Sequence, residues 1–435
     1  VTPSVILRNI LENPGWYTAY TPYQPEVSQG RLEMLMNFQQ MIIDLTGMDI
    51  ANASLLDEST AAAEAMMMAY KIKKSKQHTF CLQNSCHPQT ISVLKTRANP
   101  LGIKIIEGEP NDDTFGCFIQ NPDTYGEIHD LEKIISNNKS LEIISIVAAD
   151  IMSMVIMKSP GFYNADIVIG SSQRFGVPMG LGGPHAAFFA TKDEFKRLMP
   201  GRLIGVSVDR NNRRSYRMAL QTREQHIRRE KATSNICTAQ ALLAIISAAY
   251  AIYHGPERLK NIANNINYNA RYLKKSLQEI GFKILSKKFF DTLVIENTNA
   301  KEWFDKSVQE GMNFRLIDNT KFSLTIDETT TLEDIDSLIS FFNTSNKKLD
   351  IEKIEKNLDN VFSDENLIRD NQILSHPIFN IYHSETEMMR YLKKLENKDI
   401  ALNRSMIPLG SCTMKLNAAS EMLPITLPGF SNAHP

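Results

Sequence analysis

Polar residues at the start of a predicted helix form a first candidate site. Residues 56–62 read Leu-Asp-Glu-Ser-Thr-Ala-Ala, and the alanine-rich run that follows them is a strong helix former. A helix N-terminus offers unpaired N–H groups and the positive end of the helix dipole, and small residues let a phosphate approach it. Ser59 and Thr60 are therefore candidate phosphate ligands. They are also typical of a plain helix N-cap, which is a far more common arrangement.

An aspartate at the end of a predicted strand forms a second candidate site. Asp150 directly follows the apolar run 143–149, and ligands of open α/β sheets bind at the carboxyl ends of the strands. A carboxylate there can hold a protonated ring nitrogen, as in pyridoxal-phosphate enzymes; an N-cap or loop aspartate is the alternative.

Cys86 and His87 could form a nucleophile–base pair. Adjacent residues on an extended chain point to opposite faces, however, so a structural or ring-stacking role suits His87 better.

Three further segments have unusual composition. The glycine-rich residues 170–185 lie between two predicted strands and indicate a tight excursion near a ligand or another chain. Because no helix follows these glycines, they do not match a dinucleotide-binding fingerprint. The stiff segment 17–26, rich in tyrosine and proline, favours an interface or a pocket, or simply a packed loop. The arginine-rich segment 213–231 is local and interrupted by acids, so a solvated face or an anchor for a partner suits it better than nucleic acid.

An α/β framework must position these residues. From about residue 50, apolar runs of strand length alternate with helical patterns, which predicts a largely parallel sheet covered on both faces. The expected strands are Thr79–Leu82, Ile103–Ile106, Phe115–Ile119, Ile143–Ala149, Ala165–Ile169 and Ala186–Ala190, with helices at Ile91–Arg97 and Ile128–Ser136. A buried helix is expected over Ile236–Tyr253, and His254-Gly255-Pro256 should stop it.

The pattern changes after Gly255. Helices near 257–280, 301–310 and 332–342, with strands near 290–295 and 322–326, predict a smaller α/β domain. The expected organisation is therefore a large three-layer α/β/α domain at 1–255 and a smaller α/β domain at 256–345. Residues 346–435 are expected to hold a polar linker, one helix near 385–395 and loop-like sequence.

Composition narrows the class of protein. The chain has 435 residues and a formal net charge of −1, so no global field favours nucleic acid or a membrane surface. No apolar stretch has the roughly 20 residues that a membrane span needs. The five cysteines are scattered and form no zinc spacing, which favours reduced thiols in a cytosol-like compartment. Both ends look cut, so the chain is expected to be a fragment.

Long strings of the sequence resemble one family. They are residues 17–30 (YTAYTPYQPEVSQG), 52–66 (NASLLDESTAAAEAM), 173–189 (QRFGVPMGLGGPHAAFF), 220–237 (LQTREQHIRREKATSNIC) and 407–417 (IPLGSCTMKLN). These strings are similar to the single-chain P protein of the glycine cleavage system. That family has two homologous halves, each resembling a fold-type-I pyridoxal-phosphate transferase. The chain resembles the first half and the opening of the second, catalytic half, which would begin near residues 350–400.

The resemblance also implies that the cofactor site of this half is vestigial. In the catalytic half, the strand before the glycine-rich loop ends in His-Lys, and this lysine forms the Schiff base; here Ser172 and Gln173 stand at those positions. A glutamine cannot make that bond, and no lysine lies between Lys158 and Lys192. Gln173→Lys is expected to restore the covalent bond at most, without turnover.

Other cofactor-site positions keep matching residues. By the same resemblance, Asp150 stands at the ring-nitrogen position, His87 at the ring-stacking position, and Ser59 and Thr60 at the phosphate-binding turn. We expect these remnants to stabilise local structure and not to bind the cofactor tightly.

The family's activity implies a role for this half. The reaction is the pyridoxal-phosphate-dependent decarboxylation of glycine, with transfer of the aminomethyl group to the lipoyl arm of the H protein. Tyr20, Pro22 and Tyr23 resemble the segment that lines the active-site entrance of the catalytic half, so the expected partners are that half, the H protein and glycine. The chain alone is expected to be inactive and to have no catalytic residue or metal. The expected location is the cytoplasm, or the mitochondrial matrix in a eukaryote.

Two alternatives remain open from the sequence. One is an independently active fold-type-I pyridoxal-phosphate enzyme, similar to a desulfurase or an aminotransferase, that uses a lysine elsewhere in the chain. The other is a purely structural partner that lends no group to the active site of the catalytic half.

Overall fold

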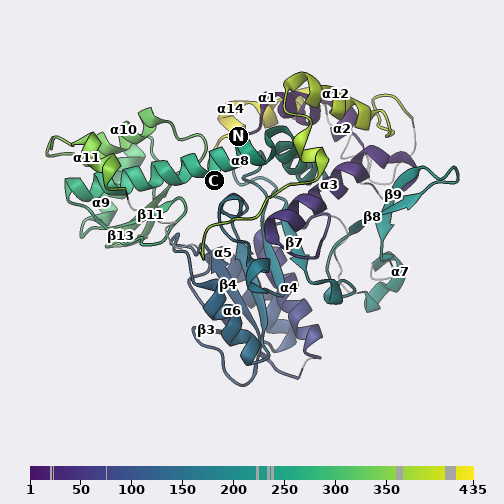
Figure 1. The fold of residues 1–435 in the computed structure, drawn as a ribbon, viewed down its shortest axis with the longest axis horizontal. Coiled ribbons are helices and arrows are strands. Elements are labelled where there is room, and N and C mark those ends of the chain that lie inside the picture. Colours follow the sequence, from purple (N-terminus) through teal and green to yellow (C-terminus); the bar gives the residue numbers. More distant parts are fainter. Residues whose placement is uncertain are drawn as a thin grey trace.

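The computed structural model describes residues 1–19, 22, 24–74, 76–221, 225–232, 236, 240–358, 366–406 and 418–435. Its centre is a seven-stranded sheet (Figure 1) with the strand order β1-β7-β6-β5-β4-β2-β3. Strands β2 to β6 pair in parallel, whereas β7 runs antiparallel to both β6 and β1. The strands are β1 (Ile50–Ala51), β2 (Thr79–Leu82), β3 (Lys104–Glu107), β4 (Thr114–Asn121), β5 (Ile144–Ala149), β6 (Ile167–Ser171) and β7 (Ala187–Thr191).

Helices cover both faces of this sheet. On one face, Ile146 and Ala148 of β5 pack with α4 (Glu58–Ile72) and α5 (Pro88–Ala98). On the other face, Val147 and Ala149 pack with α3 (Gln29–Thr46), α6 (Leu131–Ser140) and the first part of α8 (Ala241–Ile280). Successive side chains of a strand point to opposite faces, so a strand buried on both sides has a continuous apolar sequence. The expected three-layer α/β/α fold is confirmed.

Helix α8 joins the two parts of the molecule. Its first part belongs to the core under the large sheet, and Ala270, Leu273 and Leu277 belong to the core of the smaller unit. The predicted stop at residues 254–256 is instead a kink, because only Gly255, at φ 65° and ψ 177°, leaves the helical conformation. A Cβ on Gly255 would lie 2.3 Å from Cε1 of His383. The positive φ and the close packing both require glycine there.

The smaller unit is a four-stranded antiparallel sheet with two further helices. Its strand order is β10-β11-β13-β12, and Phe314, Phe322 and Phe342 stack in its core. The elements are β10 (Lys283–Ile284), β11 (Thr292–Glu296), α9 (Ala300–Gln309), β12 (Arg315–Asp318), β13 (Lys321–Thr325) and α10 (Leu332–Phe342). The helix predicted at 332–342 is therefore confirmed. In the described residues no helix is long and apolar enough to cross a bilayer.

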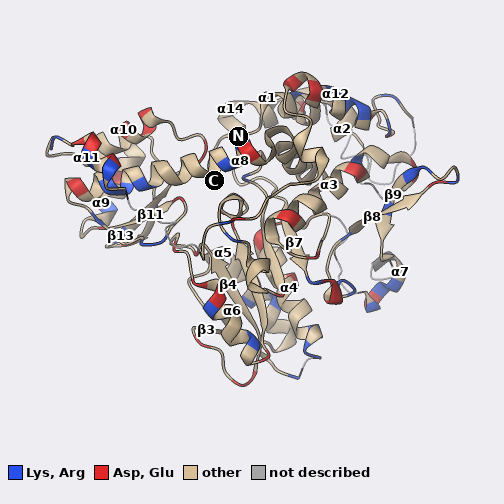
Figure 2. Ribbon diagram, in the orientation of Figure 1, with Lys and Arg blue, Asp and Glu red and all other residues tan. Residues whose placement is uncertain are grey.

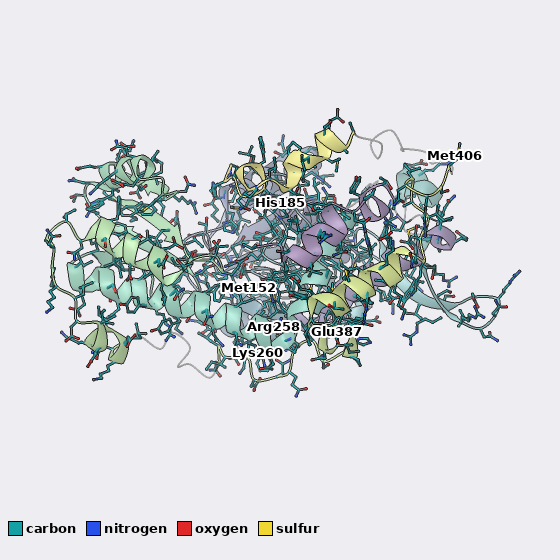
Figure 3. The ribbon with its side chains drawn as sticks, turned by 90° about the horizontal axis from the view of Figure 1, so that it is seen from above. Met152, His185, Arg258, Lys260, Glu387 and Met406 are labelled. Carbon is teal, nitrogen blue, oxygen red and sulfur yellow. The ribbon has the colours of Figure 1, made fainter. Side chains whose placement is uncertain are left out.

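The chain after the smaller unit returns to the large core. Helix α11 (Ile351–Lys356) contacts α8, and α12 (Glu385–Glu396) packs against α3. The Asp399 carboxylate accepts hydrogen bonds from the Gly30 amide and from Nη1 of Arg31, both at 2.6 Å, in a buried ion pair. Nη1 of Arg258 on α8 donates a hydrogen bond at 3.3 Å to the carbonyl of His383, shortly before α12, and Figure 3 labels Arg258 together with Glu387 of α12.

Both ends of the described chain contact the glycine-rich loop. The Thr2 hydroxyl donates a hydrogen bond to the Gly176 carbonyl at 2.6 Å. The Gly180 and Leu181 amides donate to the carbonyls of Ser431 and Ala433, each at 2.9 Å. The short helices near the two ends are α1 (Ser4–Ile6), α2 (Pro14–Tyr17), α13 (Ala419–Met422) and α14 (Pro428–Ser431).

The sequence analysis did not predict a hairpin in the arginine-rich segment. Strands β8 (Leu203–Val208) and β9 (Arg214–Ala219) form a two-stranded antiparallel sheet that projects from the body (Figure 1). Figure 2 shows basic residues along β9 and α7 (Gln225–Arg228). Because Val206 and Val208 are 59% and 62% exposed, this segment is an exposed arm with both apolar and basic side chains.

Candidate functional site

Two neighbouring cavities lie at the carboxyl ends of the parallel strands. Their volumes are about 560 Å³ and about 240 Å³. Glu58, His87, Ser171 and Gln173 line both of them. The larger one is also lined by Asp57, Ser59, Pro88, Gln89, Thr90, Thr124, His185 and Arg315, and the smaller one by Gln120, Pro122, Asp123, Gly126, Asp150, Arg174, Asp291, Thr292 and Thr325. This is the sheet edge at which α/β proteins bind ligands.

The N-terminus of helix α4 borders the larger cavity, but its N-cap is not one of the residues that the sequence predicted. The helix begins at Glu58 and its N-cap is Asp57, whose carboxylate accepts a hydrogen bond from the Thr60 amide at 2.7 Å. Ser59 and Thr60 therefore stand inside the first turn, because Asp57 is already an excellent N-cap. Ser59 lines the cavity, and its hydroxyl lies 3.2 Å from that of Thr90. Thr60 is not among the lining residues, and its amide is bound by Asp57.

His87 lies at the N-cap of α5 and borders both cavities. Its Nδ1 is 3.1 Å from the Thr124 hydroxyl. The neighbouring Cys86 thiol donates to the Asn84 carbonyl at 3.3 Å, and burial raises the pKa of this thiol to about 12. Cys86 is therefore a protonated core residue, and the Cys86–His87 nucleophile hypothesis has no support in the structure.

Asp150 lies at the end of β5, as predicted, but a cation of the chain itself pairs with it. Its Oδ2 accepts a hydrogen bond from Nη1 of Arg174 at 3.1 Å, and its Oδ1 accepts one from the Ser153 amide at 2.7 Å. The same Nη1 donates to Asp291 at 2.5 Å. Burial lowers the pKa of Arg174, but the two carboxylates outweigh it, so its pKa lies above the ordinary value. Arg174 is therefore a firmly charged group between two acids.

The structure separates Ser172 from Gln173. Ser172 is fully buried, where its hydroxyl donates to the Ala186 carbonyl at 2.7 Å and lies 3.0 Å from the Ser247 hydroxyl. Ser172 thus holds the strand end against α8. Gln173 follows β6 and borders both cavities. Among the described residues that line either cavity there is no lysine.

Glu58 and Arg315 are among the lining residues that the sequence analysis did not identify. Glu58 borders both cavities and accepts a hydrogen bond from the Gln120 side chain at 3.2 Å. Burial raises the pKa of Glu58, and the nearby His87 opposes that rise. Arg315 reaches the larger cavity from the smaller unit, and its Nη1 donates to the Thr124 carbonyl at 2.8 Å. Glu58 belongs to the polar string 56–62 but was not singled out there, whereas no local pattern points to Arg315.

None of the described residues of the aromatic segment, 17–19, 22 and 24–26, lines either cavity. Pro22 is buried and lines a separate small pocket with Leu35, Ile204 and Met218. Tyr20 and Tyr23 lie outside the described residues.

A comparison with known protein families shows which family the chain belongs to. The sequence model of the family described as "Glycine cleavage system P-protein" matches residues 1–342. The chain belongs to the glycine cleavage system P-protein family. Within this P-protein family, the curated glycine dehydrogenase (decarboxylating) of Pelagibacter ubique is 55% identical over 441 residues, and that of Stutzerimonas stutzeri is 53% identical over 440 residues. Both alignments cover all of this chain but 46% of the relative, so the chain spans about half the length of these relatives.

Solved structures support the P-protein fold. A glycine decarboxylase (P-protein) in inhibitor-bound form aligns with a TM-score of 0.74 at 32% identity, covering 79% of this chain and 82% of that one. A C-DES mutant with glycine covalently linked to its PLP cofactor aligns with a TM-score of 0.59 at 12% identity, over 79% of this chain and 94% of that one. At such low identity the second likeness shows the fold alone, that of the fold-type-I pyridoxal-phosphate enzymes.

Proposed function

We propose that this chain is the first, non-catalytic half of a glycine dehydrogenase (decarboxylating). In this proposal the complete protein decarboxylates glycine and passes the aminomethyl group to the lipoyl group of the H protein. The catalytic second half holds the pyridoxal phosphate, and this half supports that site. The observation that carries the proposal is a cavity at the ligand-binding edge of the sheet with Gln173, and no lysine, on its described lining. The bacterial relatives favour a cytoplasmic location.

The residues at this edge do not fit a covalently held pyridoxal phosphate. Lys158 and Lys192, the lysines nearest to Gln173 in sequence, make contacts elsewhere, with the Phe162 ring and with Asp166. Asp150, which would hold the ring nitrogen, is paired with Arg174. Ser59 and His87 still line the cavity, but they supply no covalent attachment.

An exposed apolar surface supports a second half as the partner. Around the contact between the glycine-rich loop and the C-terminal residues, Leu181 is 60% exposed and Phe430 is 53% exposed. Met179 and Leu427 are also exposed apolar residues of these two segments. Apolar side chains that share one surface are typical of an interaction site. We propose that the second half covers this surface, and that Tyr20, Pro22 and Tyr23 line the entrance to its active site.

Glycine–bicarbonate exchange tests the proposal. The chain alone should show no exchange above background, with or without added pyridoxal phosphate. The chain together with its second half should be active, and the covalently bound cofactor should be found by mass spectrometry on the second half only. Exchange by the isolated chain, dependent on pyridoxal phosphate, would instead establish the independently active enzyme.

Tyr20→Ala in the assembled enzyme separates active-site support from a purely structural role. Because an entrance residue acts on substrate access, we expect glycine turnover to fall about tenfold or more while the assembly stays intact by size-exclusion chromatography. Tyr268→Ala, on the part of α8 that extends into the smaller unit, is the matched control and should leave turnover unchanged. Full activity of Tyr20→Ala would favour the structural partner.

A further inference from the structure

The arrangement around Arg174 gives a second reason, independent of the missing lysine, for this half to lack the cofactor. Arg174 lies between Asp150, at the end of a central strand, and Asp291, directly before β11 of the smaller unit. Its guanidinium also lies 5.4 Å from the centre of the Phe290 ring. The side chain is thus held by both parts of the molecule, in the smaller cavity that borders Gln173.

Both carboxylates use the same nitrogen of Arg174. Nη1 donates to Asp150 and to Asp291, whereas Nη2 is buried and has no partner among the described residues. The contact is therefore a single cationic point shared by two acids, not a bidentate fork. Two carboxylates this close repel each other, and burial of Asp291, whose side chain is 9% exposed, adds to the cost of its charge unless a cation lies beside it. The chain itself supplies one positive charge at this point, in Arg174.

We propose that Arg174 is an internal substitute for the cationic ring of pyridoxal phosphate: it neutralises Asp150 and excludes the cofactor from this half. In pyridoxal-phosphate enzymes the corresponding aspartate pairs with the protonated ring nitrogen. A second cation at Asp150 would lie beside the Arg174 guanidinium, which repels it and already donates a hydrogen bond to Oδ2 of Asp150. The inference rests on the proposed function only in the choice of pyridoxal phosphate as the excluded ligand.

The inference predicts that a substitution should create binding. Threonine at position 174 removes the guanidinium and leaves Asp150 and Asp291 without their cation, so a protonated ring should then be attracted. Pyridoxine 5′-phosphate is the suitable probe, because it has the ring nitrogen and the phosphate but no aldehyde, so the missing lysine does not matter. Calorimetry on the full chain, with any catalytic site already loaded with pyridoxal phosphate, measures this additional site alone.

Arg174→Thr should bind pyridoxine 5′-phosphate at least about tenfold more tightly than the unsubstituted chain, which corresponds to about 1.4 kcal/mol. Arg174→Lys, which keeps one positive charge, is the control and should show no gain. If Arg174→Thr does not fold, as judged by circular dichroism, Arg174→Thr with Asp291→Asn removes the repulsion between the two acids and gives the same test.

Three outcomes would overturn the inference. They are equally tight binding by the unsubstituted chain, no gain in a folded variant that lacks Arg174, and an equal gain in Arg174→Lys. None of them bears on glycine–bicarbonate exchange, so failure of this inference and failure of the proposed function are distinguishable.

Discussion

At the scale of single residues, the sequence pointed to the role of Gln173 but not to that of Arg174. Gln173 could be recognised because a matching string places it where a lysine is expected, and because a glutamine lacks the required chemistry. Arg174 could not, since its partners Asp150 and Asp291 are 24 and 117 residues away along the chain. An arginine beside a glycine-rich loop gives no signal of its own. Its role follows from the fold, which brings a strand end and the smaller unit to the same point.

The two residues together define a prediction about covalent attachment. Gln173→Lys alone should not attach pyridoxal phosphate, because Arg174 still neutralises Asp150; this revises the expectation from sequence. Gln173→Lys with Arg174→Thr should attach it, with a new absorbance band that is lost on borohydride reduction and a corresponding mass increase on a peptide containing residue 173. Gln89→Lys with Arg174→Thr places a lysine elsewhere on the cavity wall and is the control. Attachment by Gln173→Lys alone, at the level of the double variant, would contradict this prediction.

At the scale of elements, the kink in α8 depends on one glycine. Gly255→Ala should destabilise the fold by more than about 2 kcal/mol, since alanine is strained at positive φ and its Cβ would overlap His383. Gly281→Ala is the matched control, because Gly281 also has a positive φ but has nothing within 4 Å of a built Cβ. That change should cost only about 1–2 kcal/mol. Urea unfolding measures both, and equal losses would refute the packing argument.

The buried ion pair between Arg31 and Asp399 joins α3 to the segment after α12. Asp399→Asn should lower the free energy of unfolding by about 3–5 kcal/mol, because it leaves a buried guanidinium without its counter-charge. Glu352→Gln removes one partner of an exposed pair with Lys356 and should change stability by at most about 1 kcal/mol. A loss below about 1 kcal/mol for Asp399→Asn, measured by urea unfolding, would show that the pair does not anchor this segment.

Elements with a regular local pattern of apolar residues were predictable, whereas those with mixed environments were not. Strand β2 and helix α10 were predicted with the bounds that the structure has, because β2 is a continuous buried run and α10 has its buried residues at helical spacing. Helix α3 was missed because it buries polar residues among the apolar ones: Arg31 pairs with Asp399, and the Gln39 side chain bonds the Ile204 backbone of β8. Strand β8 was missed because it exposes its valines. In both cases a distant partner, not the local pattern, determines the structure.

At the scale of the whole molecule, the proposed interface makes the isolated chain prone to self-association. Leu181→Ser with Phe430→Ser should reduce self-association of the chain alone, measured by light scattering, and should weaken its complex with the second half at least about tenfold. Val308→Ser changes a residue that is 55% exposed on the smaller unit and should have neither effect. An unchanged complex with the double variant would place the interface elsewhere.

The pairing of Arg31 with Asp399 also determines when the chain can finish folding during its synthesis on the ribosome. The two residues are 368 positions apart, so at about 5–20 residues per second synthesis needs roughly 20–70 s after Arg31 before its counter-charge exists. During that time α3 has neither the acid that binds its first amides nor α12 to cover it. A nascent chain that ends at residue 342, where the family match ends, still lacks both Asp399 and α12. The core under the large sheet is therefore completed only after the smaller unit has been synthesised, and its apolar surface is a natural target for chaperones until then.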